Sequence, residues 1–414
     1  MEELLYLAHR IPYPPNKGDK IRSYHLLKHL SRNFKVHLGA FVDDPEDWKY
    51  AQSLMDMVSG EVKLLPLNPV WATLRSTYGL LSGEPLSAPY YRNAKLKNWV
   101  NQLIANRPIR HVLVFSSAMS QYVTAYPKLH RIIDFVDIDS DKWRQYSERK
   151  SWPMNWIYQR EARALFAFER RIASTFDASA FVSRAEAELF QQLAPECASR
   201  VTYYHNGVDL DYFSPTLDYD TPYPPGERVL VFTGAMDYWA NVDAVTWFAR
   251  EVFPVLRAQF SDVRFYIVGS RPTEEVQALA GAGIIVTGSV PDIRPYVAHA
   301  AISVAPLRIA RGIQNKVLEA MAMAKPVVVS PQALEGIDAE TNREVILAND
   351  ASAFITRIAA QLSQPDETLG QAARRRVDQA YRWDSSLQRV DRLLEQAHTI
   401  SNPIDQLRSI NEHR

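Results

Sequence analysis

The sequence predicts an α/β fold made of two successive open sheets of parallel strands. Three observations support this: short apolar runs alternate with helical patterns, a Pro- and Gly-rich stretch at 218–228 interrupts the alternation, and the alternation then restarts. The strands expected before the interruption are residues 4–9, 34–42, 62–67, 111–115, 131–136, 178–182 and 201–204. Those expected after it are residues 228–232, 263–268, 284–287, 302–305, 326–329 and 344–347.

Helical patterns fit between these strands, notably at residues 19–30, 241–260 and 314–324. We expect an N-terminal domain at 1–206, a C-terminal domain at 207–385, and at 386–414 a helix that packs back toward the N-terminal domain, followed by a polar tail. Ligands of open α/β sheets bind beyond the carboxyl ends of the strands, so the expected site is a central cleft between the domains. No Gly-x-Gly-x-x-Gly pattern follows either first strand, which disfavours a dinucleotide-dependent oxidoreductase.

The composition is that of an ordinary globular protein. Of the 414 residues, 47% are apolar, and 47 basic side chains balance 47 acidic ones, which disfavours a nucleic-acid partner. The single cysteine, Cys197, excludes an internal disulfide and a cysteine-rich zinc site, and it fits a cytoplasmic location. The N-terminal residues lack a signal-peptide pattern, and no stretch approaches the roughly 18 apolar residues of a spanning helix. We therefore expect a soluble protein, or at most one attached to a membrane surface.

The segment 308–324 has the strongest functional pattern. A helix expected to begin near Gly312 or Ile313 would offer unpaired N–H groups and a positive dipole end to a phosphate. Lys316 and Glu319 are three residues apart and share a helix face. One interpretation is a diphosphate held by the first amides and Lys316, with Glu319 accepting hydrogen bonds from sugar or ribose hydroxyls; the other is an ordinary amphipathic helix with a surface ion pair. The donor-binding residues predicted here are Arg308, Arg311, Gly312, Ile313, Lys316 and Glu319.

The same segment resembles the donor-site motif of family 4 glycosyltransferases. Its residues from Glu319 onward read Glu-Ala-Met-Ala-Met-Ala-Lys-Pro-Val-Val-Val, which matches the second glutamate of that motif and the strand after it. Arg311 stands where the family has its first glutamate, which contacts the donor sugar. Some branches carry Gly-x-x-x-Lys-x-x-Glu instead, a pattern that Gly312, Lys316 and Glu319 satisfy.

Other segments extend this resemblance to the family. The stretch around Gly234 resembles the first strand and loop of the donor domain, residues 287–293 with Val290 resemble the loop that holds the nucleotide base, and residues 205–209 resemble the hinge. Gly18 matches a loop glycine that contacts the donor from the opposite domain. Taken one at a time, these segments also fit plain strand ends with turn residues.

Charged residues of the N-terminal half supply further candidates. Lys17, Lys20 and Arg22 are predicted to bind an anionic acceptor, the alternative being a Pro-rich turn with solvated charges. Asp137 follows an expected strand where many family members have a histidine, so the resemblance implies a catalytic contact to sugar or acceptor. The aspartates at 139 and 141 are typical of helix caps, and they lack the glycine and glutamate of an EF-hand loop.

Aromatic and basic residues alternate at 141–174, among them Trp143, Tyr146, Trp152, Trp156 and Tyr158. This pattern fits a membrane interface, and it also fits a domain core flanked by cations whose stems lie along apolar surface. The sequence leaves both interpretations open.

Three stretches carry a narrower resemblance: Pro-Tyr-Pro-Pro-Asn-Lys-Gly-Asp-Lys-Ile-Arg near the N-terminus, Asp-Ser-Asp-Lys-Trp, and Arg-Gly-Ile-Gln-Asn-Lys-Val-Leu-Glu-Ala-Met-Ala. With them the chain as a whole, about residues 4–395, is similar to sugar transferases found with exosortase (PEP-CTERM) and exopolysaccharide systems. The resemblance implies a GT-B architecture, with two Rossmann-like domains facing a central cleft, and a retaining enzyme of the hexosyltransferase type. It implies a nucleoside-diphosphate sugar donor, a glycan or polyprenyl-linked acceptor, and catalysis by Asp137, Lys316 and Glu319 without a metal or cofactor. The expected location is cytoplasmic or peripheral on the cytoplasmic face of the inner membrane. Two alternatives are a non-catalytic sugar-nucleotide binding protein and a GT-B sugar-nucleotide epimerase.

Overall fold

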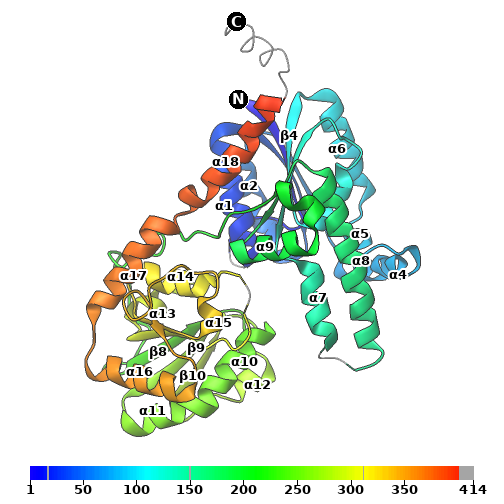
Figure 1. Cartoon of the computed structure of the whole chain (residues 1–414). Coiled ribbons are helices and arrows are strands. Elements are labelled where there is room, and N and C mark those ends of the chain that lie inside the picture. The colour runs from blue at the N-terminus through cyan, green and yellow to red at the C-terminus, as the bar shows by residue number, and fades with distance from the viewer. Residues whose placement is uncertain (16–17, 149–150, 311, 401–414) are drawn as a thin grey trace, which may run out of the picture. The chain divides into compact units, whose positions relative to one another are not determined.

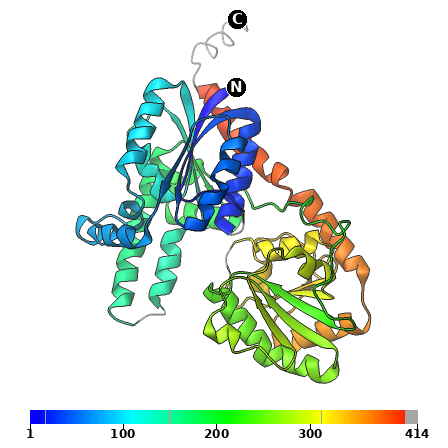
Figure 2. The ribbon, with the colours of Figure 1, turned by 180° about the vertical axis from the view of Figure 1, so that it is seen from behind.

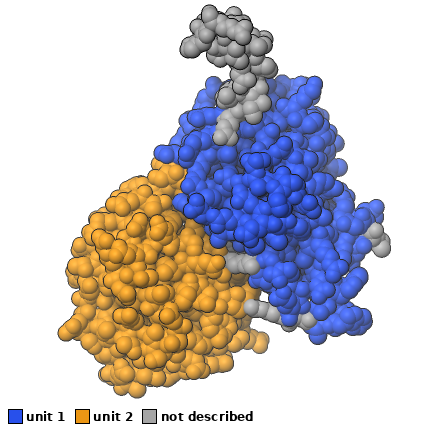
Figure 3. Space-filling model, in the orientation of Figure 1, with its two compact units in different colours: residues 1–205, 387–414 blue, residues 206–386 orange. Residues whose placement is uncertain are grey.

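The computed structural model describes residues 1–15, 18–148, 151–310 and 312–400. The chain forms two compact units, of which unit 1 comprises Met1–His205 with Leu387–Arg414 and unit 2 comprises Asn206–Ser386 (Figure 3). Both units are α/β, so the predicted fold class is confirmed. None of the described helices is long and apolar enough to cross a bilayer.

Unit 1 is built on a seven-stranded parallel sheet with the order β3-β2-β1-β4-β5-β6-β7 (Figures 1 and 2). Its strands are β1 Glu2–Ala8, β2 Phe34–Val42, β3 Val62–Pro66, β4 Ile109–Phe115, β5 His130–Val136, β6 Ala178–Phe181 and β7 Val201–Tyr203. All seven predicted strands are present, and their ends differ from the prediction by at most two residues. Residues 4–8 of β1 are all buried, as expected for the central strand of a parallel sheet covered on both faces.

Helices connect these strands. They are α1 Gly18–Asn33, η1 Pro45–Tyr50, α2 Ala51–Met57, α3 Pro69–Ser76, α4 Tyr78–Ser82, α5 Ser87–Tyr90, α6 Ala94–Asn106, η2 Ser117–Tyr122, α7 Asp139–Glu148, α8 Met154–Thr175, α9 Arg184–Leu193 and η3 Pro195–Arg200. The last helix, α18 (Trp383–Ile400), belongs to unit 1 from Leu387 onward. Its Asp391 lies 2.8 Å from the Nε2 of His29, and its Arg389 donates to the carbonyl of Tyr203 at 3.0 Å.

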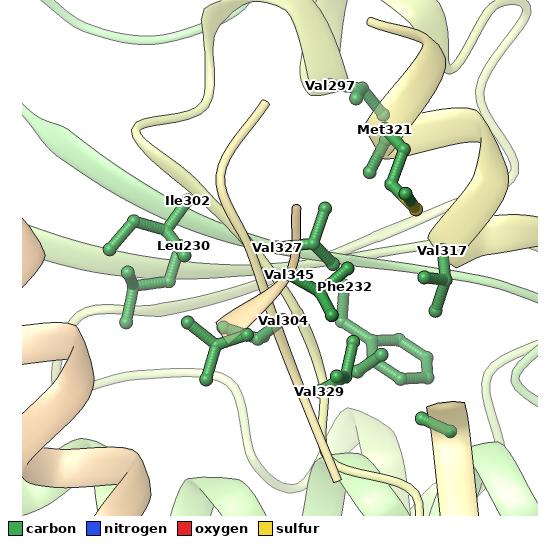
Figure 4. Packing of buried hydrophobic residues seen from close by; sticks show 14 of the residues in the cluster. Leu230, Phe232, Val297, Ile302, Val304, Val317, Met321, Val327, Val329 and Val345 are labelled. Carbon is green, nitrogen blue, oxygen red and sulfur yellow. The ribbon is translucent and has the colours of Figure 1, made fainter. Parts of the chain in front are cut away.

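Unit 2 contains a six-stranded parallel sheet with the order β10-β9-β8-β11-β12-β13. The strands are β8 Arg228–Thr233, β9 Val263–Val268, β10 Ile284–Gly288, β11 Ile302–Ala305, β12 Val327–Val329 and β13 Ile346–Leu347. Leu230, Phe232, Val304 and Val329 from neighbouring strands pack together in the core, and Val317 of a covering helix belongs to the same cluster (Figure 4). All six predicted strands are again present, the last one shorter than expected.

The helices of unit 2 are α10 Trp239–Trp247, the π-helix η4 Phe248–Val252, α11 Phe253–Gln259, α12 Glu274–Gln277, α13 Arg294–His299, α14 Asn315–Ala322, α15 Pro331–Leu334, α16 Ala351–Ser363 and α17 Glu367–Ala380. The single helix predicted at 241–260 is wrong, because a π-helical turn interrupts it. Pro254 has no N–H to donate to the carbonyl of Arg250, so the regular α-helical ladder cannot continue through it.

The strand order of each sheet reverses direction at one point, between β1 and β4 in unit 1 and between β8 and β11 in unit 2. Loops that follow the two strands at such a point diverge and leave a crevice, where open α/β sheets bind ligands. In unit 2 the described residues of these loops are 234–238, 306–310 and 312–314, which carry the glycines singled out from the sequence.

Candidate functional site

Lys316 lies beside the loop that follows β8, at the point where the strand order of unit 2 reverses. It is the second residue of α14, and its Nζ donates a hydrogen bond to Asn241 Oδ1 of α10 at 2.5 Å. The same Nζ lies 4.3 Å from the centre of the Phe232 ring of β8, an attractive cation–π arrangement. As a whole residue, Lys316 is partly exposed.

Gly234 forms the floor beside this lysine. Its φ of +154° lies in the region that favours glycine. A Cβ at this position would lie 2.7 Å from Asn241 Nδ2 and 3.2 Å from Lys316 Nζ. Asn241 Nδ2 donates to the carbonyl of Ala235 at 2.8 Å, so this amide is fixed at both ends. The glycine predicted as a donor contact is therefore required by both its backbone conformation and its neighbours.

Glu319 follows one turn after Lys316 on the same face of α14. Burial lowers the pKa of Lys316 to about 7 and raises the pKa of Glu319 to about 7, while the attraction between the two groups opposes both shifts. An anion placed beside Lys316 would restore its full charge. Ionisable groups with strongly shifted pKa values are typical of binding and catalytic sites.

The predicted start of this helix is wrong. Gly312 has φ +64° and Ile313 buries its side chain in the core, so α14 begins only at Asn315, after the N-cap residue Gln314. A left-handed glycine cannot be part of a right-handed helix turn, and the amides of Gly312 and Ile313 precede the helix instead of opening it. Arg311 lies outside the described residues.

Arg308 takes no part in the Lys316–Asn241 arrangement. Its guanidinium pairs with Asp243 of α10, with the Nε at 2.9 Å from Oδ2. Asn241 and Asp243 lie about 200° apart around the helix, so Arg308 and Lys316 bind different faces of α10. The contact of Arg308 with a donor is accordingly not supported by the geometry.

Val290 follows β10 and packs, partly buried, against a small cluster that includes Tyr223 and Tyr266. Nearby, Arg294 pairs with Asp292 at 2.6 Å, and its guanidinium carbon lies 3.8 Å from the centre of the Tyr212 ring. Burial, Asp292 and Glu319 all raise the pKa of Tyr212. The contribution of Glu319 indicates that Tyr212 lies near it. No local sequence pattern indicates this pair, because Tyr212 and Arg294 lie 82 residues apart in the chain.

Lys20 and Arg22 are buried inside unit 1, contrary to the prediction that they bind an acceptor. Lys20 Nζ lies 2.5 Å from Asp47 Oδ2. Arg22 is fully buried, with its Nε 2.8 Å from Asp134 Oδ2 and its guanidinium carbon 3.7 Å from the centre of the Tyr204 ring. Each cation already pairs with a buried carboxylate, Asp47 or Asp134. Because both side chains are buried, they cannot contact an acceptor in this conformation. Lys17 lies outside the described residues.

Asp137 follows a strained turn at the carboxyl end of β5. Val136 has φ +70°, which is rare for a β-branched residue, and the N–H of Asp137 donates to the carbonyl of Phe135 at 3.0 Å, forming a γ-turn. The carboxylate of Asp137 lies 2.8 Å from Lys142 Nζ. Strain of this kind gathers at functional positions, so Asp137 stays a prediction with a geometric reason in its favour.

Gly18 is exposed and forms the first residue of α1. Among the described residues, no atom lies within 4 Å of the position that a Cβ would occupy, and the φ of Gly18 is not in the positive range. The described part of unit 1 therefore does not require a glycine here. Its predicted contact with a donor remains untested.

Two doubly wound parallel-sheet units in one chain define the GT-B architecture, as predicted, and three solved structures share it. Sucrose-phosphate synthase from Thermosynechococcus elongatus superposes with a TM-score of 0.71 at 15% identity, covering 97% of this chain and 100% of that one. HepE from Anabaena in complex with UDP-glucose gives 0.64 at 15% identity, covering 96% and 100%. WaaG, a glycosyltransferase involved in lipopolysaccharide biosynthesis, gives 0.60 at 15% identity, covering 91% and 95%.

Comparison with protein-family models gives a match within unit 2. Residues 227–364 match the family model described as glycosyl transferases group 1. This range contains β8 to β13 and the whole arrangement of Gly234, Asn241, Lys316 and Glu319. No curated protein matches the chain significantly.

Proposed function

We propose that this chain is a glycosyltransferase that binds a nucleoside-diphosphate sugar in unit 2 and transfers the sugar to a glycan or a lipid-linked acceptor. One observation carries the proposal: Lys316 is fixed by Asn241 beside Gly234, at the point where the strand order of unit 2 reverses. The similarity of residues 227–364 to group 1 glycosyl transferases supports it, as does the UDP-glucose bound to HepE.

In this proposal the diphosphate lies against Lys316 and the first turn of α14. As the bond between sugar and diphosphate breaks, negative charge accumulates on the leaving group, and a fixed cation and the helix dipole stabilise that charge. Glu319 accepts hydrogen bonds from sugar or ribose hydroxyls. Asp137 contacts the sugar or the acceptor, and transfer proceeds with retention at the anomeric carbon, without a metal. The role in exopolysaccharide biosynthesis rests on the sequence resemblance alone.

A binding screen followed by product analysis tests this proposal. Calorimetry with UDP-, GDP-, ADP- and dTDP-sugars identifies the nucleotide, and a polyprenyl-linked acceptor is then added with the sugar that binds. We expect binding by one nucleotide class, and a glycosylated product of retained anomeric configuration. Lys316→Ala should weaken binding by about 100-fold, the cost of losing a charge-assisted contact to phosphate. Binding without transfer or hydrolysis would favour a non-catalytic protein, and conversion of the donor without an acceptor would favour an epimerase.

A further inference from the structure

The turn that joins β5 to α7, residues 136–140, is held by buried carboxyl groups of two other helices. Glu186 of α9 accepts a hydrogen bond from the N–H of Ile138 at 2.9 Å. Glu169 of α8 accepts one from the N–H of Ser140 at 3.3 Å and another from the Oγ of the same serine at 2.6 Å. Both glutamates are buried. The turn is therefore tied to α8 and α9 through its own backbone.

The sheet holds the rest of this turn. The N–H of Val136 donates to Oδ1 of the buried Asp134 at 3.0 Å, and the carbonyl of Val136 accepts from the N–H of Val182, just after β6, at 2.6 Å. Val136 has φ +70°, a costly conformation for a β-branched residue. Such strain persists only where the surrounding structure over-determines it. Bonds from β5, α8, α9 and the end of β6 supply that surplus here.

A carboxylate on α7 itself would cap this helix at less cost. Asp139 and Asp141 lie in its first turn, and aspartate is among the preferred capping residues. Both side chains bind basic residues of α7. Burying a carboxyl group from another helix costs free energy that a local cap does not. A local cap fixes a helix start to the helix alone, whereas Glu169 and Glu186 fix it in place within unit 1.

The turn carries Asp137, the residue predicted to contact the sugar or the acceptor. Lys142 Nζ donates to Asp137 Oδ2 at 2.8 Å and to Asp139 Oδ1 at 3.1 Å. The other carboxylate oxygen of Asp137, Oδ1, receives no hydrogen bond from the described part of the chain, and the residue is partly exposed. Such an oxygen can accept a hydrogen bond from a ligand hydroxyl. Its position depends on the position of the turn.

Helix α7 is anchored further along as well. Trp143 packs against the core of unit 1, and its ring centre lies 5.1 Å from that of Tyr158 of α8. Both views of the ribbon show α7 and α8 side by side (Figures 1 and 2). Of the two interpretations that the sequence left open for these aromatic residues, the core applies to Trp143 and Tyr158, whereas Trp152 and Trp156 are exposed.

We propose that Glu169 and Glu186 are positioning residues of the transfer reaction, which hold the turn so that Asp137 meets a hydroxyl of the sugar or the acceptor. The inference rests on the proposed function, because it concerns the contact that Asp137 makes there. Neither glutamate touches a ligand in this arrangement. Reaction rates depend steeply on such placement, since a displacement of about 1 Å can cost on the order of 100-fold.

Methionine substitutions remove the hold with little change in side-chain volume. Glu169→Met and Glu186→Met each leave a backbone N–H of the turn without its acceptor. Each variant should lower kcat by about tenfold or more, because the turn can then move. The dissociation constant of the donor should not change, since the proposed donor site lies in unit 2. Transfer kinetics of the full chain, with the donor and acceptor found in the screen, measure kcat, and calorimetry measures donor affinity.

Glutamine substitutions should recover most of the kcat that the methionine variants lose. The amide oxygen of glutamine accepts a hydrogen bond from a backbone N–H as a carboxyl oxygen does. Burial raises the pKa of Glu169 to about 8, and the charge of Asp139 raises it too, so this carboxyl is largely neutral near neutral pH. Glu169→Gln therefore preserves both the acceptor and the charge, and Glu186→Gln preserves the acceptor.

Glu161→Met is the matched control. Glu161 is likewise buried in α8 and accepts a hydrogen bond from a backbone N–H, that of Leu86 at 2.7 Å, but this amide lies outside the turn. The variant should lower the unfolding midpoint as Glu169→Met does and leave kcat unchanged. All variants are assayed below their unfolding midpoints, and Glu169→Met and Glu186→Met are independent tests, so either one that folds is sufficient.

A double-variant cycle separates positioning from general support of the fold. In an Asp137→Ala background, Glu169→Met should cause no further fall in kcat, because the contact that it positions is already gone. A fall by the same factor in both backgrounds would overturn the inference. So would an unchanged kcat in both folded methionine variants, or an equal loss in Glu161→Met. These results leave donor binding and transfer by the unchanged chain intact, whereas a chain that binds no donor and transfers no sugar overturns the proposed function and this inference with it.

Discussion

Lys316 and Asn241 are joined by a hydrogen bond between the start of α14 and α10, although 75 residues separate them in the chain. The bond holds the ammonium group over Phe232 and beside Gly234. Lysine side chains lose much conformational freedom on being fixed, so a partner that fixes the lysine beforehand reduces the cost of binding.

Asn241→Ala should weaken donor binding by about tenfold without unfolding the protein. The substitution frees Lys316 and removes the donor to the carbonyl of Ala235, each worth about 1 kcal/mol. Calorimetry with the nucleotide-sugar found in the screen measures the affinity. Asp243→Ala is the matched control on the same helix: it breaks only the exposed pair with Arg308, so donor affinity should not change. A loss of donor affinity in Asp243→Ala would instead indicate that Arg308 contacts the donor.

Donor affinity should fall as the pH rises above about 7. Burial lowers the pKa of Lys316 to about 7, so the free protein loses the positive charge in this range, whereas the bound diphosphate favours the protonated form. Linkage then requires proton uptake on binding, and affinity falls by up to about tenfold per pH unit. A nucleotide-sugar has no phosphate group that titrates near neutrality, so the effect belongs to the protein.

Lys316→Arg provides the control for this dependence, because arginine stays charged over the whole range. Its affinity should vary less between pH 6 and about 9, and the dependence that remains belongs to Glu319, whose pKa burial raises to about 7. Calorimetry in buffers of different ionisation enthalpy measures the proton uptake directly. A pH-independent affinity in the unchanged chain would contradict the shifted pKa of Lys316.

Gly18→Ala should leave stability unchanged or slightly raised and reduce transfer. Alanine favours a helix by up to about 1 kcal/mol over glycine, and no neighbour obstructs its methyl group. If Gly18 contacts the donor, the methyl group raises the KM for the donor or lowers kcat. Gly234→Ala should differ by also lowering the unfolding midpoint, because its Cβ would lie 2.7 Å from Asn241 Nδ2. Unchanged kinetics in Gly18→Ala would remove Gly18 from the site.

Local patterns were enough to predict the two sheets, because each strand is a short apolar run of its own. They were not enough at element ends: a left-handed Gly312 delays α14 to Asn315, and Pro254 breaks a helix whose apolar pattern continues through it. Periodicity reports which residues are apolar, whereas these boundaries depend on backbone geometry at one residue.

Charged residues were the least predictable part of the site. Lys20 and Arg22 look like solvated cations in a loop-and-helix segment, because their partners Asp47 and Asp134 lie 27 and 112 residues away in the chain. Burial of a charge depends on the fold bringing an opposite charge to it. Asn241 could not be predicted for the same reason, because its hydrogen-bond partner Lys316 lies 75 residues later in the chain.

Arg22→Met should destabilise unit 1 by about 3–5 kcal/mol, because it leaves the carboxylate of Asp134 buried without its cation. Chemical denaturation of the full chain measures this loss. The double variant Arg22→Met/Asp134→Asn removes the uncompensated charge and should recover part of the stability. If Arg22 instead bound an acceptor, Arg22→Met would raise the KM for the acceptor and leave the unfolding free energy unchanged. The two roles therefore differ in which measurement responds, and the double variant adds a second distinction, because neutralising Asp134 cannot restore a lost acceptor contact.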